Sequence, residues 1–92
     1  MIKSFKSKGL EKLFTRGDGS KLNQAHLKRI RRILLILNNA KILEDVNIPG
    51  LRLHKLKGDL KNKYSLDVSG NFRIHFKFVD GDIEDVDYED TH

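Results

Sequence analysis

The stretch "NFRIHFKF", residues 71–78, decides the fold. Successive side chains of a strand point to opposite faces, so alternating apolar and basic residues predict a strand with one face on a core. The opposite face then meets solvent or a polyanion. The inward set is Phe72, Ile74, Phe76 and Phe78, and the outward set is Arg73, His75 and Lys77.

Period-two segments continue on both sides of this strand. "YSLDV" (residues 64–68) precedes it across the turn "SGN" (69–71), and "IEDVDY" (83–88) follows it across the turn "DGD" (80–82). In the last segment Val86 and Tyr88 share a face. Consecutive strands joined by tight turns predict an antiparallel meander.

A further strand is expected in "LRLHKLK" (residues 51–57), after the only proline, Pro49. Its apolar residues change parity along the segment. This change predicts a bulge or the end of the strand near His54 and Lys55.

The first half of the chain predicts a short strand at residues 2–5 and two helices. "KGLEKLF" (8–14) is a short helix, "TRGDGS" (15–20) is a loop, and residues 22–43 carry apolar side chains at intervals of three and four. Most of the basic side chains in the middle of this long helix are interpreted as a solvated face, the set being Lys28, Arg29, Arg31 and Arg32. The predicted class is α+β, with the N-terminal strand and two helices packed on one face of an antiparallel sheet.

Composition limits the function. We expect residues 1–92 to form a single domain, and the absence of cysteine excludes disulfides and thiolate metal sites. No apolar run approaches the roughly 20 residues that span a bilayer, so we expect a cytoplasmic protein that does not associate with membranes.

The charge is unevenly distributed. Residues 80–92 hold seven acidic residues and no Lys or Arg, which leaves six acids against 18 bases in residues 1–79, a local net charge of +12. A basic body suggests a phosphate-binding surface. The alternative is a soluble domain with an acidic tail.

Basic and imidazole side chains suggest where phosphate could be held. His54 lies beside Arg52, Lys55 and Lys57, and a bulge could direct His54 and Lys57 across the sheet, where Arg73 faces outward. Guanidinium groups bind phosphate in a bidentate manner, and lysine adds a point charge. A lone histidine on a surface is usually unremarkable, and His26 is interpreted in that way.

The ending "YEDTH" adds an acid and an imidazole. In an extended strand Asp90 and His92 leave on the same side, although a frayed acidic end is the alternative. RNA can be cut without metal when its 2′-hydroxyl attacks the adjacent phosphate, which requires a base, an acid and fixed positive charge. His54 or His92 with Asp90 could transfer the protons, and Lys57 and Arg73 could stabilise the charge. No spacing typical of a metal site is present, and no cofactor is expected.

Together, "MIKSFKSKGLEKLF", "RLHKLKGD", "YSLDVSGNFRIHFKF" and "YEDTH" make the chain resemble the HigB toxins of the RelE superfamily of messenger-RNA interferases. The resemblance implies a RelE-like domain and metal-independent cleavage of translated messenger RNA in the ribosomal A site. It implies a helix-turn-helix antitoxin of the HigA type, with operator DNA bound only through the antitoxin complex. The implied catalytic residues are His54, Lys57, Arg73, Asp90 and His92.

Additional contacts to RNA and to the small ribosomal subunit are expected from Arg52, Lys55, Lys61, His75, Lys77 and Thr91. Members of the family often carry tyrosine where this chain has Thr91, and a basic or imidazole side chain where it has Ser7. The missing ring leaves open reduced activity, altered codon preference or a shifted role for Tyr88.

Two other functions stay open at this point. One is a non-catalytic RNA- or ribosome-binding module, for which binding would depend strongly on salt but RNA length would not change. The other is a degenerate toxin that acts only in a repressor complex with an antitoxin.

Overall fold

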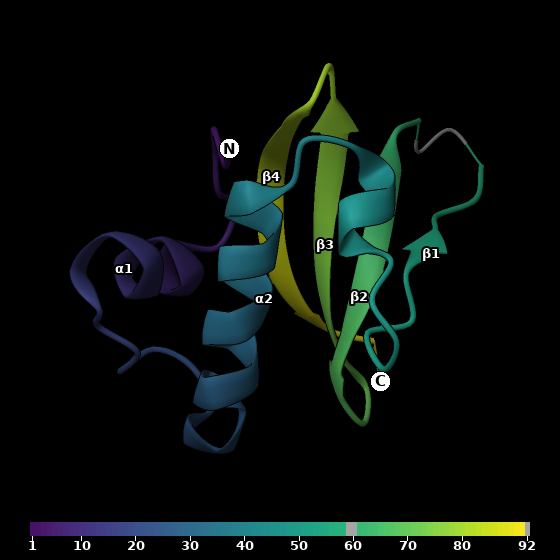
Figure 1. The fold of residues 1–92 in the computed structure, drawn as a ribbon. Helices are drawn as coiled ribbons and strands as arrows, with labels where there is room; N and C mark the ends of the chain where they lie inside the picture. The colour runs from purple at the N-terminus through teal and green to yellow at the C-terminus, as the bar shows by residue number, and fades with distance from the viewer. Residues whose placement is uncertain (59–60, 92) are drawn as a thin grey trace.

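The computed structural model describes residues 1–58 and 61–91. A four-stranded antiparallel sheet in the order β1-β2-β3-β4 forms one layer, and α1 and α2 form the other (Figure 1). The strands are β1 (His54–Lys55), β2 (Lys63–Ser69), β3 (Phe72–Val79) and β4 (Asp82–Asp90), and the helices are α1 (Lys8–Arg16) and α2 (Leu27–Asn39). The predicted α+β class with helices on one face of an antiparallel sheet is confirmed.

The core lies between the helices and the inner face of the sheet. Leu66 of β2 and Ile74 and Phe76 of β3 are buried, as the alternating pattern predicts. The helical layer covers them with a stripe of apolar residues from both helices, namely Leu10, Leu13, Ile30, Ile33, Leu34 and Leu37. The face of the sheet away from the helices is called the outer face below.

A bulge in β4 changes which of its residues face inward. The register between β3 and β4 shifts, and Asp85 takes a left-handed φ of 53°. The Ser4 hydroxyl accepts a hydrogen bond from the Asp85 amide at 2.9 Å and donates to its carboxylate at 3.3 Å. Ile83 and Val86, three residues apart, are consequently both buried. Val86 and Tyr88 share the inner face as predicted, but strict alternation would have placed Ile83 outside.

Two predicted strands are shorter in the structure. Residues 2–5 make only two isolated parallel bridges to β4, through Ile2 and Phe5, rather than a strand. The strand expected over residues 51–57 is reduced to the two residues of β1, because Arg52 adopts a left-handed φ of 52° just before it. This left-handed residue supplies the irregularity that the parity change predicted near His54.

The long helix predicted over residues 22–43 is divided. The 3-10 turn η1 (Gln24–His26) precedes α2, and the 3-10 turn η2 (Leu43–Val46) follows it. At the end of α2, Ala40 is extended and the carboxylate of Asp45 accepts bonds from the Lys41 and Ile42 amides. These two bonds lower the pKa of Asp45. Among the described residues no helix is long and apolar enough to cross a membrane.

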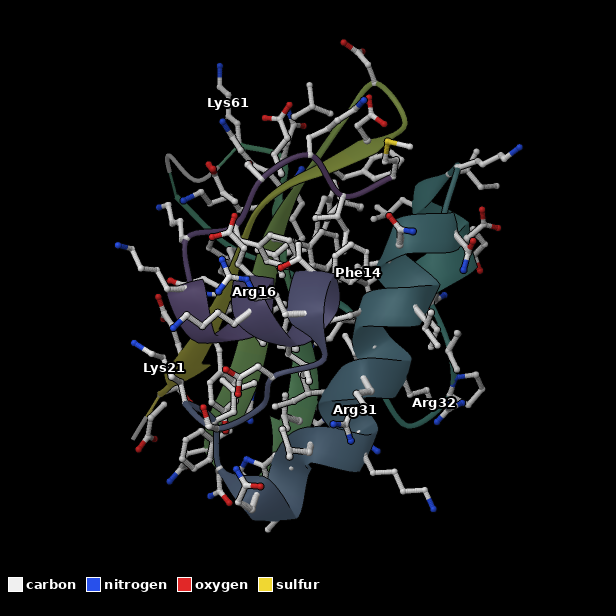
Figure 2. The ribbon with its side chains drawn as sticks, turned by 90° about the vertical axis from the view of Figure 1, so that its left-hand side faces the viewer. Phe14, Arg16, Lys21, Arg31, Arg32 and Lys61 are labelled. Atoms are coloured by element: carbon white, nitrogen blue, oxygen red, sulfur yellow. The ribbon has the colours of Figure 1, made fainter. Side chains whose placement is uncertain are left out.

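Arg29 departs from the solvated helix face expected for most of the basic residues of α2. Its guanidinium donates to the carbonyl of Gly50 at 2.7 Å and to that of Asp67 at 3.3 Å, so it ties α2 to β2. Figure 2 shows Arg31 and Arg32 on the helical side of the molecule, where the solvated interpretation applies.

Ser7 caps α1, and we expect its loss to weaken the fold. The Ser7 hydroxyl accepts from the Leu10 amide at 3.1 Å, and replacing such a cap with alanine costs about 1 kcal/mol. Ser7→Ala should therefore lower the melting temperature by roughly 4–8 °C in thermal unfolding followed by circular dichroism. Ser69→Ala, at the exposed end of β2, is the control, expected to change the free energy of unfolding by less than about 0.5 kcal/mol. An unchanged melting temperature for Ser7→Ala would show that the cap contributes nothing.

Candidate active site

Cross-strand neighbours share a face of a sheet, so the strand registers arrange the outer-face residues in rows. One row contains Asp67, Arg73 and Glu89, and Arg52 joins it through an ion pair from its Nε to Asp67 at 3.6 Å. The next row contains His54, Ser65, His75 and Asp87. The outer face therefore brings together Arg52, His54, Arg73 and His75 from the predicted set.

Arg73 is fixed by contacts at one end of the sheet. Its Nε lies 3.0 Å from a carboxylate oxygen of Asp67, and its Nη1 donates to the carbonyls of Gly70 at 2.6 Å and Phe72 at 3.1 Å. The side chain is 26% exposed, so its head is partly buried in polar contacts rather than projecting into solvent. None of these three contacts uses Nη2. Its two N–H groups are hydrogen-bond donors that can bind an anion.

Asp67 belongs to the candidate site by its contacts, and the sequence analysis missed it. It lies between the inward residues Leu66 and Val68 and directly opposite Arg73 across the β2–β3 hairpin. Counting the register outward from the turn at residues 69–71 would have paired the two side chains. Asp67 holds Arg73 in place while its own charge is shared with Arg52.

The end of the chain converges on the same hairpin turn. The Thr91 amide and hydroxyl both donate to the carbonyl of Asn71 at 2.8 Å, next to the Gly70 carbonyl that binds Arg73. The C-terminus accordingly lies beside the lower end of β2 and β3 in Figure 1. His92, predicted to act here, lies outside the described residues.

Asp90 reaches this end of the sheet from the other side. It lies opposite Phe72, whose side chain packs against the core, whereas its neighbour Glu89 lies opposite Arg73 on the outer face. Asp90 and Arg73 therefore flank the hairpin turn from opposite faces.

The remaining predicted residues are spread along β1 and toward the far end of the sheet. His54 bonds through Nδ1 to the carbonyl of Arg52 and is exposed. Lys55 lies opposite Tyr64, on the helical side, and Lys57 is exposed just beyond β1. Lys77 lies opposite Lys63, and Lys61 lies at the top of the molecule in Figure 2, away from the hairpin turn.

The outer face is mixed in charge, and not basic throughout as the pattern of residues 71–78 suggests. His75 lies 3.4 Å from the carboxylate of Glu89, because β4 runs alongside β3 and brings its acids with it. A hollow of about 300 Å³ on this side is lined by both signs of charge, its charged and imidazole side chains being Lys6, Lys63, His75, Asp85, Asp87 and Glu89. The acidic end of the sequence is thus a strand of the sheet and not a separate tail.

The interpretation of His26 as an ordinary surface residue is wrong. Its side chain is only 8% exposed, its Nδ1 lies 2.7 Å from the Tyr88 hydroxyl, and its ring packs edge-on against Phe72 at 4.7 Å. The 3-10 turn that replaces the predicted first turn of the long helix directs the imidazole toward the sheet. The pKa of Tyr88 is raised mainly because its side chain is partly buried, and secondarily because the negative charge of Asp90 is nearby.

The described residues contain no group of three or more histidine and carboxylate side chains that could hold a metal ion. The site contains the fixed guanidinium of Arg73, the exposed imidazole of His54, exposed lysines such as Lys57, and the carboxylate of Asp90 near the chain end. Such groups bind a phosphodiester and transfer protons.

Comparison with known proteins gives a consistent result. A family model described as "HigB-like toxin: RelE-like toxin of type II toxin-antitoxin system HigB" matches residues 3–92. Endoribonuclease HigB of Proteus vulgaris is 40% identical over 92 residues, which cover all of both chains. Toxin HigB-1 of Vibrio cholerae serotype O1 is 34% identical over 83 residues, which cover 88% of this chain and 87% of that protein.

Proposed function

The chain belongs to the HigB-like toxins, RelE-like proteins of type II toxin–antitoxin systems, and from this premise we propose that this endoribonuclease cuts translated messenger RNA in the ribosomal A site. The observation that carries the proposal is the meeting of Arg73 and the chain end at the turn of the β2–β3 hairpin. Positive charge and proton-transferring groups are both needed at one scissile phosphate. We place the reaction in the cytoplasm, where ribosomes translate.

In this mechanism the 2′-hydroxyl of the RNA attacks the adjacent phosphorus and the 5′-oxygen leaves. The products are a 2′,3′-cyclic phosphate and a 5′-hydroxyl, and the reaction needs no metal ion. Asp67 presents Arg73 in a fixed orientation, so its Nη2 donors can bind the negative phosphoryl oxygens as charge develops. Lys57 adds charge, and His54, Asp90 and His92 exchange the protons.

The mixed charge of the outer face supports dependence on the ribosome. A bare RNA strand would be attracted near Arg52 and Arg73 but repelled along β4, where Asp87 and Glu89 face outward. Binding to RNA alone should therefore be weak. The ribosome can supply the RNA binding that this surface lacks, because it holds the message in position. The small toxin then contributes only the catalytic groups.

Further contacts to the message and the small ribosomal subunit are proposed for the exposed cations. Arg52, Lys57 and Lys61 are exposed, and His75 and Lys77 belong to the outer-face side chains of β3. Thr91 has its hydroxyl bonded to Asn71, so it can contribute to RNA binding only by exchanging that bond. Lys55, on the helical side of β1, would contact RNA only if the strand wraps around the edge of the sheet.

The test is cleavage mapping on ribosomes assembled with a message and tRNA. Wild-type protein should produce a cut in the A-site codon with a 5′-hydroxyl on the downstream fragment, and little cleavage of the same RNA without ribosomes. A message with a 2′-deoxynucleotide at the scissile position should resist cutting. Equal cleavage of free RNA would overturn ribosome dependence, and a 5′-phosphate product would overturn attack by the 2′-hydroxyl.

We further propose that the partner is a HigA-like helix-turn-helix antitoxin, and that an acidic amphipathic element of it binds between α1 and α2. A groove of about 250 Å³ there is lined by Leu13, Phe14, Arg31, Leu34 and Leu35. Figure 2 shows Phe14 and Arg31 on this side of the molecule. The two helices carry seven Lys and Arg against one acid, Glu11, so a partner that fits the groove must present carboxylates around apolar anchors. Operator DNA would then be bound by the antitoxin and not by this chain.

A charge placed in this groove should weaken antitoxin binding. Leu35 is 60% exposed, and Leu35→Glu puts a carboxylate where the partner is expected to bring carboxylates and apolar side chains. We expect affinity for the purified antitoxin to fall by roughly 30-fold or more in titration calorimetry. Ile42→Glu is the matched control, since Ile42 is 59% exposed but does not line the groove. Equal affinities for the two variants would place the antitoxin elsewhere.

A further inference from the structure

Three rings form a cluster where α2 begins and the sheet ends. Phe72 and Tyr88 stack with centroids 5.4 Å apart, and the His26 ring stands edge-on to Phe72 at 4.7 Å and to Tyr88 at 6.2 Å. The 2.7 Å contact between His26 Nδ1 and the Tyr88 hydroxyl fixes the tyrosine side chain. Nothing in the cleavage mechanism above uses His26 or Tyr88.

The cluster adjoins Asp90 on two sides. Phe72 is the cross-strand neighbour of Asp90, and Tyr88 precedes it by two residues on the same face of β4. The raised pKa of Tyr88 reflects its burial and, in addition, the nearby carboxylate of Asp90. Phe72 and Tyr88 are therefore the aromatic neighbours of Asp90 at the end of the sheet.

In the described part of the chain, the last residues of β4 form a backbone ladder on one side only. The N-terminal segment bonds to β4 as far as Val86, through the amides of Lys6 and Ser7. Beyond Val86, the described backbone pairs with β3 alone, which makes residues 87–90 an edge. An edge strand twists and frays more readily than a strand paired on both sides, so the position of its last carboxylate depends on side-chain contacts.

We infer that His26 and Tyr88 are positioning residues for the endoribonuclease reaction: their hydrogen bond holds the end of β4 so that Asp90 meets the scissile phosphodiester. The inference rests on the proposed function, in which Asp90 takes part in proton transfer. A catalytic group displaced by a fraction of an ångström reacts more slowly without binding its substrate less tightly. Loss of the hydrogen bond should consequently appear in kcat and not in KM.

Tyr88→Phe tests the inference, because it removes the hydroxyl and keeps the ring that stacks on Phe72. We expect kcat for cleavage on translating ribosomes to fall roughly tenfold to hundredfold with KM changed less than about twofold. Tyr64→Phe is the matched control: Tyr64 also packs on the core, against Phe76, but lies in β2 away from the chain end, and its kcat should not change. An unchanged kcat for Tyr88→Phe would overturn the inference.

A double-mutant cycle separates positioning from a general structural effect. If Tyr88 acts through Asp90, then Tyr88→Phe should slow the wild-type enzyme but cause no further loss in an Asp90→Asn background. If the double variant lost kcat by the product of the two single losses, the two residues would act independently and the inference would be overturned. An unchanged kcat in Asp90→Asn alone would overturn it as well.

A structural measurement keeps the two proposals distinguishable. Hydrogen exchange of the backbone amides of residues 87–90, followed by NMR, should be faster in Tyr88→Phe and unchanged in Tyr64→Phe. If wild-type protein cuts no message, the proposed function fails, while the exchange rates still decide whether the tyrosine hydroxyl holds the end of β4. Unchanged exchange in Tyr88→Phe would contradict this role of the hydroxyl directly.

Discussion

Arg73→Ala is expected to lower the rate of message cleavage on ribosomes by a factor of about 10²–10³, the usual loss when one preorganised donor to a developing oxyanion is removed. The guanidinium is held by Asp67 and by the Gly70 carbonyl beside the chain end, so no neighbouring cation can take its exact place. Single-turnover cleavage, with ribosomes and toxin in excess over message, measures the chemical step. Binding to ribosomes should fall much less than the rate.

The fold should survive this substitution. The ion pair with Asp67 is partly exposed and Arg52 remains 3.6 Å from the same carboxylate, so we expect a loss of only about 1 kcal/mol in the free energy of unfolding. Arg32→Ala, which removes an exposed guanidinium from the helical side of the molecule, is the matched control and should change the rate less than about threefold. Should Arg73→Ala unfold, Arg73→Lys keeps a positive charge without the planar donors. Full activity of Arg73→Lys would show that charge alone suffices.

The strand pattern predicted the fold well because burial alternates regularly where a strand is paired on both sides. Ile74 and Phe76 of β3 are almost wholly buried, and the residues between them face out. The apolar stripe of α2 was equally clear, since Ile30, Leu34 and Leu37 point to one side of a regular helix. In both cases the period of the backbone alone determines which side chains are inside.

Irregular backbone limited the rest of the prediction. The inward position of Ile83 depends on the left-handed residue Asp85, which no period reveals. His26 is buried because its segment winds as a 3-10 turn, which turns the ring by a different angle per residue than an α-helix does. One residue of register or a few tens of degrees of rotation moves a side chain between solvent and core.

The candidate site was predictable in its residue types but not in its contacts. Arg73 was identified from its outward position on the strand, whereas its partner Asp67 and the pairing of His75 with Glu89 follow only from the strand registers. A basic strand beside an acidic one forms local ion pairs, so net charge along the sequence overstated the basic character of the outer face. The catalytic roles assigned to His54, Lys57, Arg73, Asp90 and His92 remain predictions.

A chain ending at Tyr88 is expected to bind ribosomes but to cut at least 10³-fold more slowly than the whole protein. The truncation removes Asp90 and His92, the acid and imidazole assigned to proton transfer, together with the Thr91 bonds that hold the chain end to the hairpin. It leaves the core intact, because Tyr88 keeps its stacking with Phe72 and its bond to His26. Ribosome binding is measured by co-sedimentation, and cleavage by mapping 5′ ends on the same samples.

Asp90→Asn separates loss of chemistry from loss of structure in this experiment. The point variant keeps the Thr91 bonds and the backbone of β4, so a large fall in its rate would assign the truncation effect to the carboxylate and not to a loosened chain end. A non-catalytic RNA-binding module would tolerate both changes, because the exposed cations Arg52, Lys57 and Lys61 remain. Cleavage by the truncated chain within tenfold of the whole protein would exclude the C-terminal residues from the reaction, and the site would then have to be sought around Arg73 and His54 alone.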